Sequence, residues 1–149
     1  MSGRSALSTS TLLLDTHIAL WLGNEDARLK PATRNIIDRC WQSGGLVLLS
    51  AVFAWEIGQL IYSGRLALDF PLDTWISRFS DRPGVERIPI SHKAAAGAYA
   101  LPDLEHRDPG DRLLIAQAIE HACPLVTYDE RITRFAETHG ARYRFSVTV

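Results

Sequence analysis

Five acidic residues stand where carboxylates could act together on a bound cation. Asp108 and Asp111 open an apolar helical pattern in "HRDPGDRLLIAQA". Asp15 and Asp129 each follow a short apolar run, and Glu56 lies inside another. Clustered carboxylates repel one another unless a cation joins them, and an all-oxygen set suits Mg²⁺ or Mn²⁺ better than zinc. Such a metal would activate a water molecule and stabilise the leaving oxygen during hydrolysis of a phosphodiester.

Two of these acids also have ordinary structural explanations. Asp15 could be the N-cap of the helix predicted for "THIALW", because aspartate caps helices well. Glu56 falls on a helical stripe with Val52, Phe53 and Leu60, where an unpartnered buried charge would be costly. It therefore needs a metal or a partner, unless it is solvated at the end of the stripe or paired with an arginine.

Helix capping separates the roles of the two acids in "DPGD". Pro109 suits the first position of a helix, which makes Asp108 the predicted N-cap. Asp111 then lies in the first turn, near the positive end of the helix dipole, and has no capping role. The pattern favours a structural role for Asp108 and a functional one for Asp111.

A second capping pattern surrounds Asp129. Thr127 and Glu130 have the spacing of a capping box in "TYDERI". This spacing assigns the cap of the following helix to Thr127 and leaves Asp129 free to point toward a site.

Arginines flank both acidic motifs and could contact RNA phosphates or form a solvated helix face; they are Arg107, Arg112, Arg131 and Arg134. His106 shows no pattern that argues for a role.

The elements that must position these residues form an α/β pattern. Short apolar runs alternate with helical patterns, which predicts a mainly parallel sheet. The predicted strands cover residues 11–14, 46–49, 85–90, 124–127 and 143–147. The third of them belongs at an edge because Pro89 cannot donate to a strand ladder. If the first and fourth strands are neighbours, the acids meet beyond the carboxyl ends of the strands, where ligands of such sheets bind.

The predicted helices are punctuated by caps, prolines and glycines. They cover residues 16–22, 31–43, 51–62 and 71–79, an alanine-rich segment from 92 to before Pro102, the segment from 109 onward, and residues 129–139. Ser50 and Ser91 are predicted N-caps, and Gly140 is predicted to end the last helix.

Composition bounds the class of protein. The chain has 149 residues and a formal net charge of −1, which argues against a duplex-DNA binder with a broad basic face. We expect a tail at residues 1–10 and one domain over residues 11–149. The two cysteines stand in no metal-binding spacing, and no apolar run approaches the roughly 18 residues of a membrane span. These features predict a cytoplasmic protein with reduced, buried thiols.

Four segments together resemble a known family. "LLLDTHIALW", "WEI", "HRDPGDRLLIAQA" and "PLVTYDERI" are similar in order and spacing to the PIN-domain ribonucleases, most closely the VapC-type toxins. The resemblance runs from Leu12 to about Phe135. It implies a three-layer α/β/α sandwich and Mg²⁺- or Mn²⁺-dependent endonucleolytic cleavage of single-stranded or loop RNA, leaving 5′-phosphate and 3′-hydroxyl ends. It also implies a homodimer and a small antitoxin that blocks the site.

The resemblance places the family's four acids on Asp15, Glu56, Asp111 and Asp129. Among them we expect Asp15 and Asp111 to hold the metal. Thr127 matches a supporting hydroxyl residue, Asp108 matches a frequent acid outside the four, and Arg107 and Arg112 are candidate RNA contacts.

Gly110 is a departure from this subgroup, which more often has a bulky aromatic residue there. Glycine lowers helix propensity, so we expect a looser loop or an altered contact with substrate. This departure and the near-neutral charge motivate a rival hypothesis, a catalytically weak binding module whose acidic pocket holds a partner's basic side chain. A receiver-like phosphoacceptor domain would need a lysine after a late strand, and no lysine follows Lys93.

Overall fold

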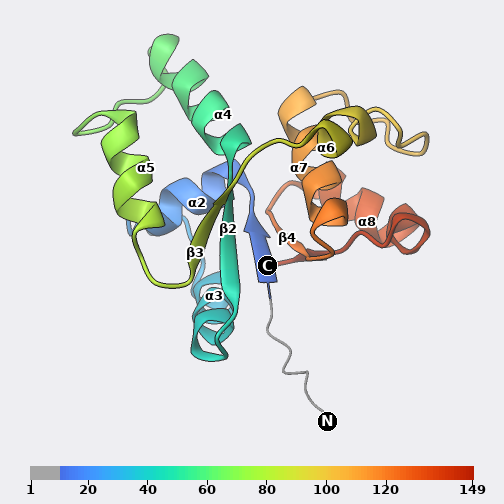
Figure 1. Ribbon diagram of the computed structural model, residues 1–149, viewed down its shortest axis with the longest axis horizontal. Coiled ribbons are helices and arrows are strands. Elements are labelled where there is room, and N and C mark those ends of the chain that lie inside the picture. The colour runs from blue at the N-terminus through green and yellow to red at the C-terminus, as the bar shows by residue number, and fades with distance from the viewer. Residues whose placement is uncertain (1–10) are drawn as a thin grey trace.

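A five-stranded sheet forms the centre of the computed structural model, which describes residues 11–149 (Figure 1). The predicted tail at residues 1–10 lies outside the described residues. The strand order is β3-β2-β1-β4-β5, and every pairing is parallel. The strands are β1 (Thr11–Leu14), β2 (Leu46–Ser50), β3 (Val85–Ile88), β4 (Leu125–Val126) and β5 (Val147–Thr148).

Helices cover both faces of this sheet. They are α2 (Thr16–Gly23), α3 (Pro31–Gln42), α4 (Ala51–Tyr62), α5 (Leu72–Ser80), α6 (His92–Gly97), α7 (Pro109–Glu120) and α8 (Glu130–Tyr143). Figure 1 shows α2 and α5 on one side of the sheet and α7 and α8 on the other. The predicted three-layer α/β/α architecture is confirmed.

Two hydrophobic cores follow from the alternation of side chains along the strands. Leu12 and Leu14 of β1 point into a core shared with α2, α3, α4 and α5. Leu13, between them, points into the opposite core, which α7 and α8 complete. All three leucines are buried, as expected for a parallel strand covered on both faces.

Several predicted boundaries were wrong, mostly toward the C-terminus. β4 and β5 have two residues each, and α6 ends at Gly97 rather than just before Pro102. Helix α8 continues through Gly140, where an added Cβ would overlap the carbonyl oxygen of Phe145. That glycine therefore permits close backbone packing, and the helix ends instead at Arg144, which has a left-handed φ of 56°.

The pairing of β1 with β4 has the largest consequence for function. Leu14 pairs with Val126, and the backbone N–H of Asp15 donates to the carbonyl oxygen of Val126 over 3.0 Å. Asp15 and Thr127 therefore leave the sheet side by side at the carboxyl ends of their strands. β3 is an edge strand, as Pro89 predicted, but it ends at Ile88 and not at the predicted residue 90.

Two further expectations concern the rest of the chain. Cys40 and Cys123 are both buried, as predicted. Among residues 11–149, none of the helices has the length and apolar character needed to cross a lipid bilayer.

Candidate active site

Asp15 joins β1 to α2 and contacts residues from both ends of the chain. Its Oδ1 accepts a hydrogen bond from the backbone N–H of Thr16 over 2.7 Å, so it is the N-cap of α2. Its Oδ2 accepts from the hydroxyl of Thr127 over 2.5 Å. Burial raises the pKa of Asp15, and these two hydrogen bonds oppose that effect. The capping explanation is confirmed, and the same carboxylate faces the neighbouring strand.

Glu56 projects from the second turn of α4 toward the same place. The hydroxyl of Thr16 donates to its Oε1. The pKa of Glu56 is raised to about 7, mainly by burial and also by the charges of three nearby acids, while the hydrogen bond from Thr16 opposes the rise; these acids are Asp111, Asp15 and Asp108. Within residues 11–149 no arginine forms an ion pair with Glu56, so the arginine alternative was wrong.

Asp111 is the most buried of the acids that the sequence singled out for metal binding. Only 8% of the residue is exposed, and its Oδ2 lies 2.5 Å from Nε2 of His106, whose side chain is 4% exposed. Burial raises the pKa of Asp111 to about 6; the hydrogen bond from His106 lowers it, whereas the charges of Asp15 and Asp108 raise it. His106 is thus a direct partner of a candidate ligand.

Asp108 caps α7 as predicted. Its Oδ1 accepts hydrogen bonds from the backbone N–H groups of Gly110 and Asp111, over 2.9 and 3.2 Å. Packing explains why Gly110 follows Asp108 and Pro109, because an added Cβ at this position would overlap the carboxylate of Glu56. The missing side chain therefore makes room for Glu56, which is a more specific effect than the loosened loop we expected.

The capping prediction for α8 was wrong. Asp129, not Thr127, is the N-cap: its Oδ1 accepts from the backbone N–H groups of Arg131 and Ile132 over 2.8 and 3.1 Å. Thr127 is fully buried, and its hydroxyl donates to Asp15 while accepting from the backbone N–H of Asp129 over 3.0 Å. Thr127 therefore links two of the acids, and Asp129 faces the site from a helix terminus.

Three helix N-termini converge on this site, because Asp15, Asp108 and Asp129 cap α2, α7 and α8. The positive ends of these helix dipoles favour negative charge nearby, whether it belongs to carboxylates or to a bound phosphate. Such an arrangement offsets part of the cost of clustering acids at one edge of a sheet.

The acids line one pocket of about 440 Å³. Its lining includes Asp15, Glu56, Asp108, Asp111 and Asp129, with Trp21, His17 and Tyr128 forming an aromatic wall and Arg131 at the edge.

Asp111 is the common member of two sets of donor atoms in this pocket. The first set is Glu56, Asp108 and Asp111, and the second is His106, Asp111 and Asp129; in each, the donor atoms lie within 4.8 Å of one another. Asp15 belongs to neither set, although its charge raises the pKa values of Glu56 and Asp111. Burial and mutual repulsion disfavour the ionised forms of these carboxylates, and a bound cation would offset both effects. Carboxylate oxygens are ligands that suit a hard divalent cation.

Arg112, one of the candidate RNA contacts, forms several bonds within the protein. Its guanidinium donates to three backbone carbonyl oxygens, those of Ala98, Leu104 and His106, over 2.8, 2.7 and 2.9 Å. It also lies over the ring of Tyr99, 5.1 Å from the centroid. These contacts fasten residues 98–106 to α7 and engage three of the five N–H donors of the guanidinium.

We therefore predict that Arg112→Ala lowers the free energy of unfolding by about 2–4 kcal/mol, because it removes three hydrogen bonds from a charged donor and leaves the three carbonyl oxygens without this partner. Arg107→Ala, at an exposed neighbouring position, should change it by less than about 0.5 kcal/mol. Urea denaturation of both variants measures the difference. Equal stabilities would contradict the role assigned to Arg112.

Sequence reasoning missed two residues of this site, His106 and Thr16. His106 lies in the loop before α7, five residues before Asp111, where no helical spacing relates the two side chains. Thr16 and Glu56 meet across 40 residues, through the packing of α2 against α4. Neither contact leaves a local signal in the sequence. The one available hint was that each residue lies close in the sequence to a candidate acid.

The comparisons agree on one family. The model for a family described as "PIN domain" matches residues 12–138. The chain is 34% identical over 123 residues to "Ribonuclease VapC22" from Mycobacterium tuberculosis, covering 83% of this chain and 90% of that protein.

Two solved structures share the fold. VapBC2 from Rickettsia felis, bound to a DNA fragment from its promoter, aligns over 93% of this chain and 97% of that one, with a TM-score of 0.65 and 17% identity. A toxin–antitoxin complex from Klebsiella pneumoniae aligns over 87% and 93%, with a TM-score of 0.51 and 19% identity. At these identities the likeness concerns the fold alone.

Proposed function

This chain belongs to the PIN-domain family, and on that premise we propose that it is a metal-dependent endoribonuclease acting as the toxin of a toxin–antitoxin pair. Its substrate is single-stranded or loop RNA in the cytoplasm, and its metal is Mg²⁺ or Mn²⁺. Four carboxylates carry the proposal, because elements far apart in the sequence bring them to one pocket at the carboxyl edge of the sheet; they are Asp15, Glu56, Asp111 and Asp129. The ribonuclease relative supports the reaction class.

Within this proposal Asp15 and Asp111 are metal ligands, and Glu56 and Asp129 complete the acidic set. A bound Mg²⁺ or Mn²⁺ would supply a Lewis acid that activates water and stabilises the leaving oxygen. The chain's own contribution is to hold the carboxylates in place: Thr127 fixes Asp15, and His106 fixes Asp111. Asp108 supports the site as the cap of α7, with one oxygen left for a second contact.

The proposed partners follow from the family and from its relatives. We propose that a small cognate antitoxin blocks the site and that the chain forms a homodimer. Structural neighbours solved as toxin–antitoxin assemblies support the first of these.

The proposal is tested by incubating the purified protein with end-labelled bacterial RNA and MnCl₂. We expect endonucleolytic products with 5′-phosphate and 3′-hydroxyl ends, identified by their response to a 5′-phosphate-dependent exonuclease. Products with 2′,3′-cyclic phosphate ends would contradict hydrolysis by a metal-activated water. Binding of Mn²⁺ without cleavage of any RNA would favour the binding-module hypothesis instead.

His106 gives a second prediction, because it positions a candidate ligand. His106→Ala should weaken Mn²⁺ binding about 10- to 100-fold, the usual effect of removing a hydrogen-bond partner of a metal ligand. His106→Gln, which retains a donor, should recover part of this loss. Isothermal titration calorimetry measures both affinities, with the exposed His92→Ala as the matched control. Unchanged affinity in His106→Ala would remove His106 from the site.

A further inference from the structure

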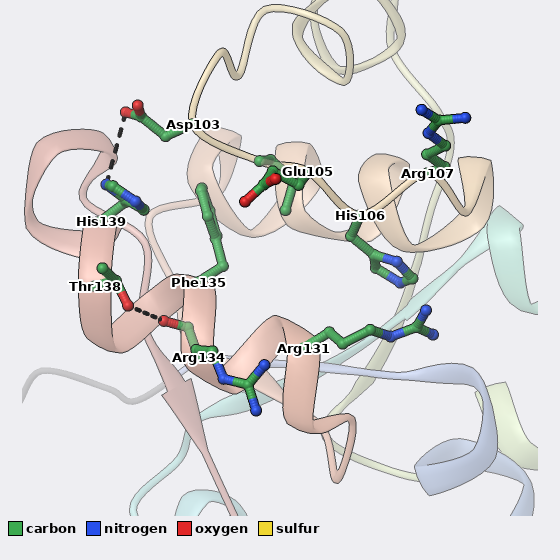
Figure 2. Close-up of a pocket in the computed structure, with 10 residues that line it drawn as sticks. Asp103, Glu105, His106, Arg107, Arg131, Arg134, Phe135, Thr138 and His139 are labelled. Carbon is green, nitrogen blue, oxygen red and sulfur yellow. Dashed lines mark hydrogen bonds and ion pairs between the residues drawn. The ribbon is translucent and has the colours of Figure 1, made fainter.

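A second cavity opens beside the acidic pocket, between α8 and the loop that precedes α7. Figure 2 shows its two walls, and its volume is about 550 Å³. Residues 103–107 form the loop wall. The helix wall is one face of α8, on which the lining residues follow the i, i+3, i+4, i+7 spacing of neighbours; they are Arg131, Arg134, Phe135 and Thr138. We call this cavity the α8 groove.

The α8 groove is continuous with the acidic pocket. Arg131 lines both cavities. His106 lines the groove and contacts Asp111 of the pocket over 2.5 Å. Any extended molecule whose reactive group lies among the acids therefore has this groove as an adjoining channel.

Three arginines line the groove, and two of them, Arg107 and Arg131, stand at the end nearest the acids. Arg107 stands on the loop wall and Arg131 and Arg134 on the helix wall (Figure 2). Within residues 11–149, neither Arg107 nor Arg134 forms an ion pair, whereas Arg131 has a long contact of 3.6 Å with Asp129. These exposed guanidiniums are available to an anionic ligand.

The two acids of the groove do not cancel this charge at that end. Asp103 lies at the far end, where it accepts from Arg142 over 2.7 Å and from the hydroxyl of Tyr143 over 2.8 Å. His139 also lies 3.8 Å from it. Glu105 is exposed on the loop wall between the ends. The near end therefore favours a ligand that carries repeated negative charge.

The loop wall is held in place before any ligand arrives. The three hydrogen bonds from Arg112 to the carbonyls of residues 98, 104 and 106 fasten this segment to α7. A preformed groove loses less conformational entropy on binding than a loop that must first become ordered.

We propose that the α8 groove binds the sugar–phosphate backbone of single-stranded RNA on one side of the cleaved bond, with Arg107, Arg131 and Arg134 contacting successive phosphates. This inference rests on the proposed ribonuclease function and adds the path of the substrate. Arginines stand on both walls of the groove, so an extended strand lying in it would meet positive charge on two sides. Cationic grooves of this kind track single strands without reading their sequence.

The test measures binding of fluorescein-labelled U₁₂ by fluorescence anisotropy as a function of salt, with all variants made in an Asp15→Asn background that prevents cleavage. The groove variant is Arg107→Ala/Arg134→Ala. The matched control is Arg39→Ala/Arg65→Ala, which removes the same charge at exposed positions on α3 and after α4. All four positions are exposed, and thermal melting checks that each double variant folds.

We expect the groove variant to bind U₁₂ about tenfold or more weakly at low salt than the parent. Its plot of log affinity against log salt concentration should be shallower by about 1.4, because each phosphate contact on a single strand contributes roughly 0.7 to the slope. The control variant should keep the parent slope. A U₁₂·A₁₂ duplex should bind the parent more weakly than U₁₂.

Equal slopes and affinities for the groove and control variants would overturn the proposal, as would a duplex bound as tightly as U₁₂. Loss of a co-expressed antitoxin from the groove variant, with U₁₂ binding unchanged, would also overturn it and assign the groove to a protein. In each of these cases RNA cleavage by the wild-type protein leaves the proposed ribonuclease function standing. Failure of the wild-type protein to cleave RNA would instead reject that function.

Discussion

Replacing Asp111 with asparagine is expected to reduce RNA cleavage by about a thousandfold or more. Asp111 is shared by both sets of donor atoms, so an uncharged amide at this position weakens every arrangement that includes it. A loss of several kcal/mol of charge stabilisation corresponds to this factor, since each 1.36 kcal/mol changes a rate tenfold. Initial rates on end-labelled RNA with MnCl₂ measure the effect.

The fold should survive this substitution. Burial raises the pKa of Asp111 to about 6, so its ionised form destabilises the metal-free protein at neutral pH. Asparagine has nearly the same shape and keeps an oxygen that accepts a hydrogen bond from His106. We therefore expect a melting temperature no lower than that of the wild type. Asp38→Asn, on α3 and away from the pocket, is the control and should retain full activity. A variant that kept more than a tenth of the wild-type rate would contradict the assignment.

Removing divalent metal is expected to abolish cleavage and to destabilise the protein in a pH-dependent way. The pKa values of Glu56 and Asp111 are raised to about 7 and about 6, from ordinary values of 4.5 and 3.8. Between about pH 4 and pH 7 the folded, metal-free protein therefore binds more protons at these groups than the unfolded chain does. Their contribution to stability is fully present below about pH 4 and is lost as pH rises through 6 and 7.

Metal binding should show the opposite trend, because a carboxylate must lose its proton to become a ligand. In EDTA we expect the melting temperature to fall by about 3 °C or more between pH 5 and pH 8, since 1 kcal/mol corresponds to roughly 2–4 °C for a domain of this size. Added MnCl₂ should raise it strongly at pH 8 and little at pH 5.

A double variant, Glu56→Gln/Asp111→Asn, is the control for this prediction. Without the two titrating groups its melting temperature should lose most of this pH dependence. An equal effect of MnCl₂ on the wild type at both pH values would contradict the linkage. Cleavage of RNA that persists in EDTA would contradict metal dependence itself.

The sequence predicted the positions of the acids better than the bonds that hold them. Apolar runs placed β1 at its observed residues and β4 within one residue at each end. The rule that ligands bind beyond the carboxyl ends of parallel strands then brought Asp15 and Asp129 to one edge. Pro109 correctly identified Asp108 as a cap. These inferences succeeded because each depends on residues that are neighbours in the sequence or on the general geometry of parallel sheets.

The errors arose where a side chain bonds to a distant part of the chain. The spacing of Thr127 and Glu130 suggested a capping box, but the hydroxyl of Thr127 bonds to Asp15, which is 112 residues away. Arg112 was interpreted as a candidate RNA contact or part of a solvated helix face, and its guanidinium binds loop carbonyls that no pattern locates. A hydrogen bond suggested by local spacing competes with tertiary hydrogen bonds of similar strength. The sequence does not show which of the two forms.

The separation between Asp15 and Thr127 also bears on when activity can arise during synthesis. β1 lies in the middle of the sheet, but its partner β4 and the cap of α8 belong to the last quarter of the chain. A ribosome adds roughly 5–20 residues per second, so for most of its synthesis the nascent polypeptide lacks half of its acidic set. On the proposed function, a product truncated before residue 125 would lack Thr127 and Asp129 and would not cleave RNA. On the same proposal, the acidic site is complete only once translation has passed Asp129.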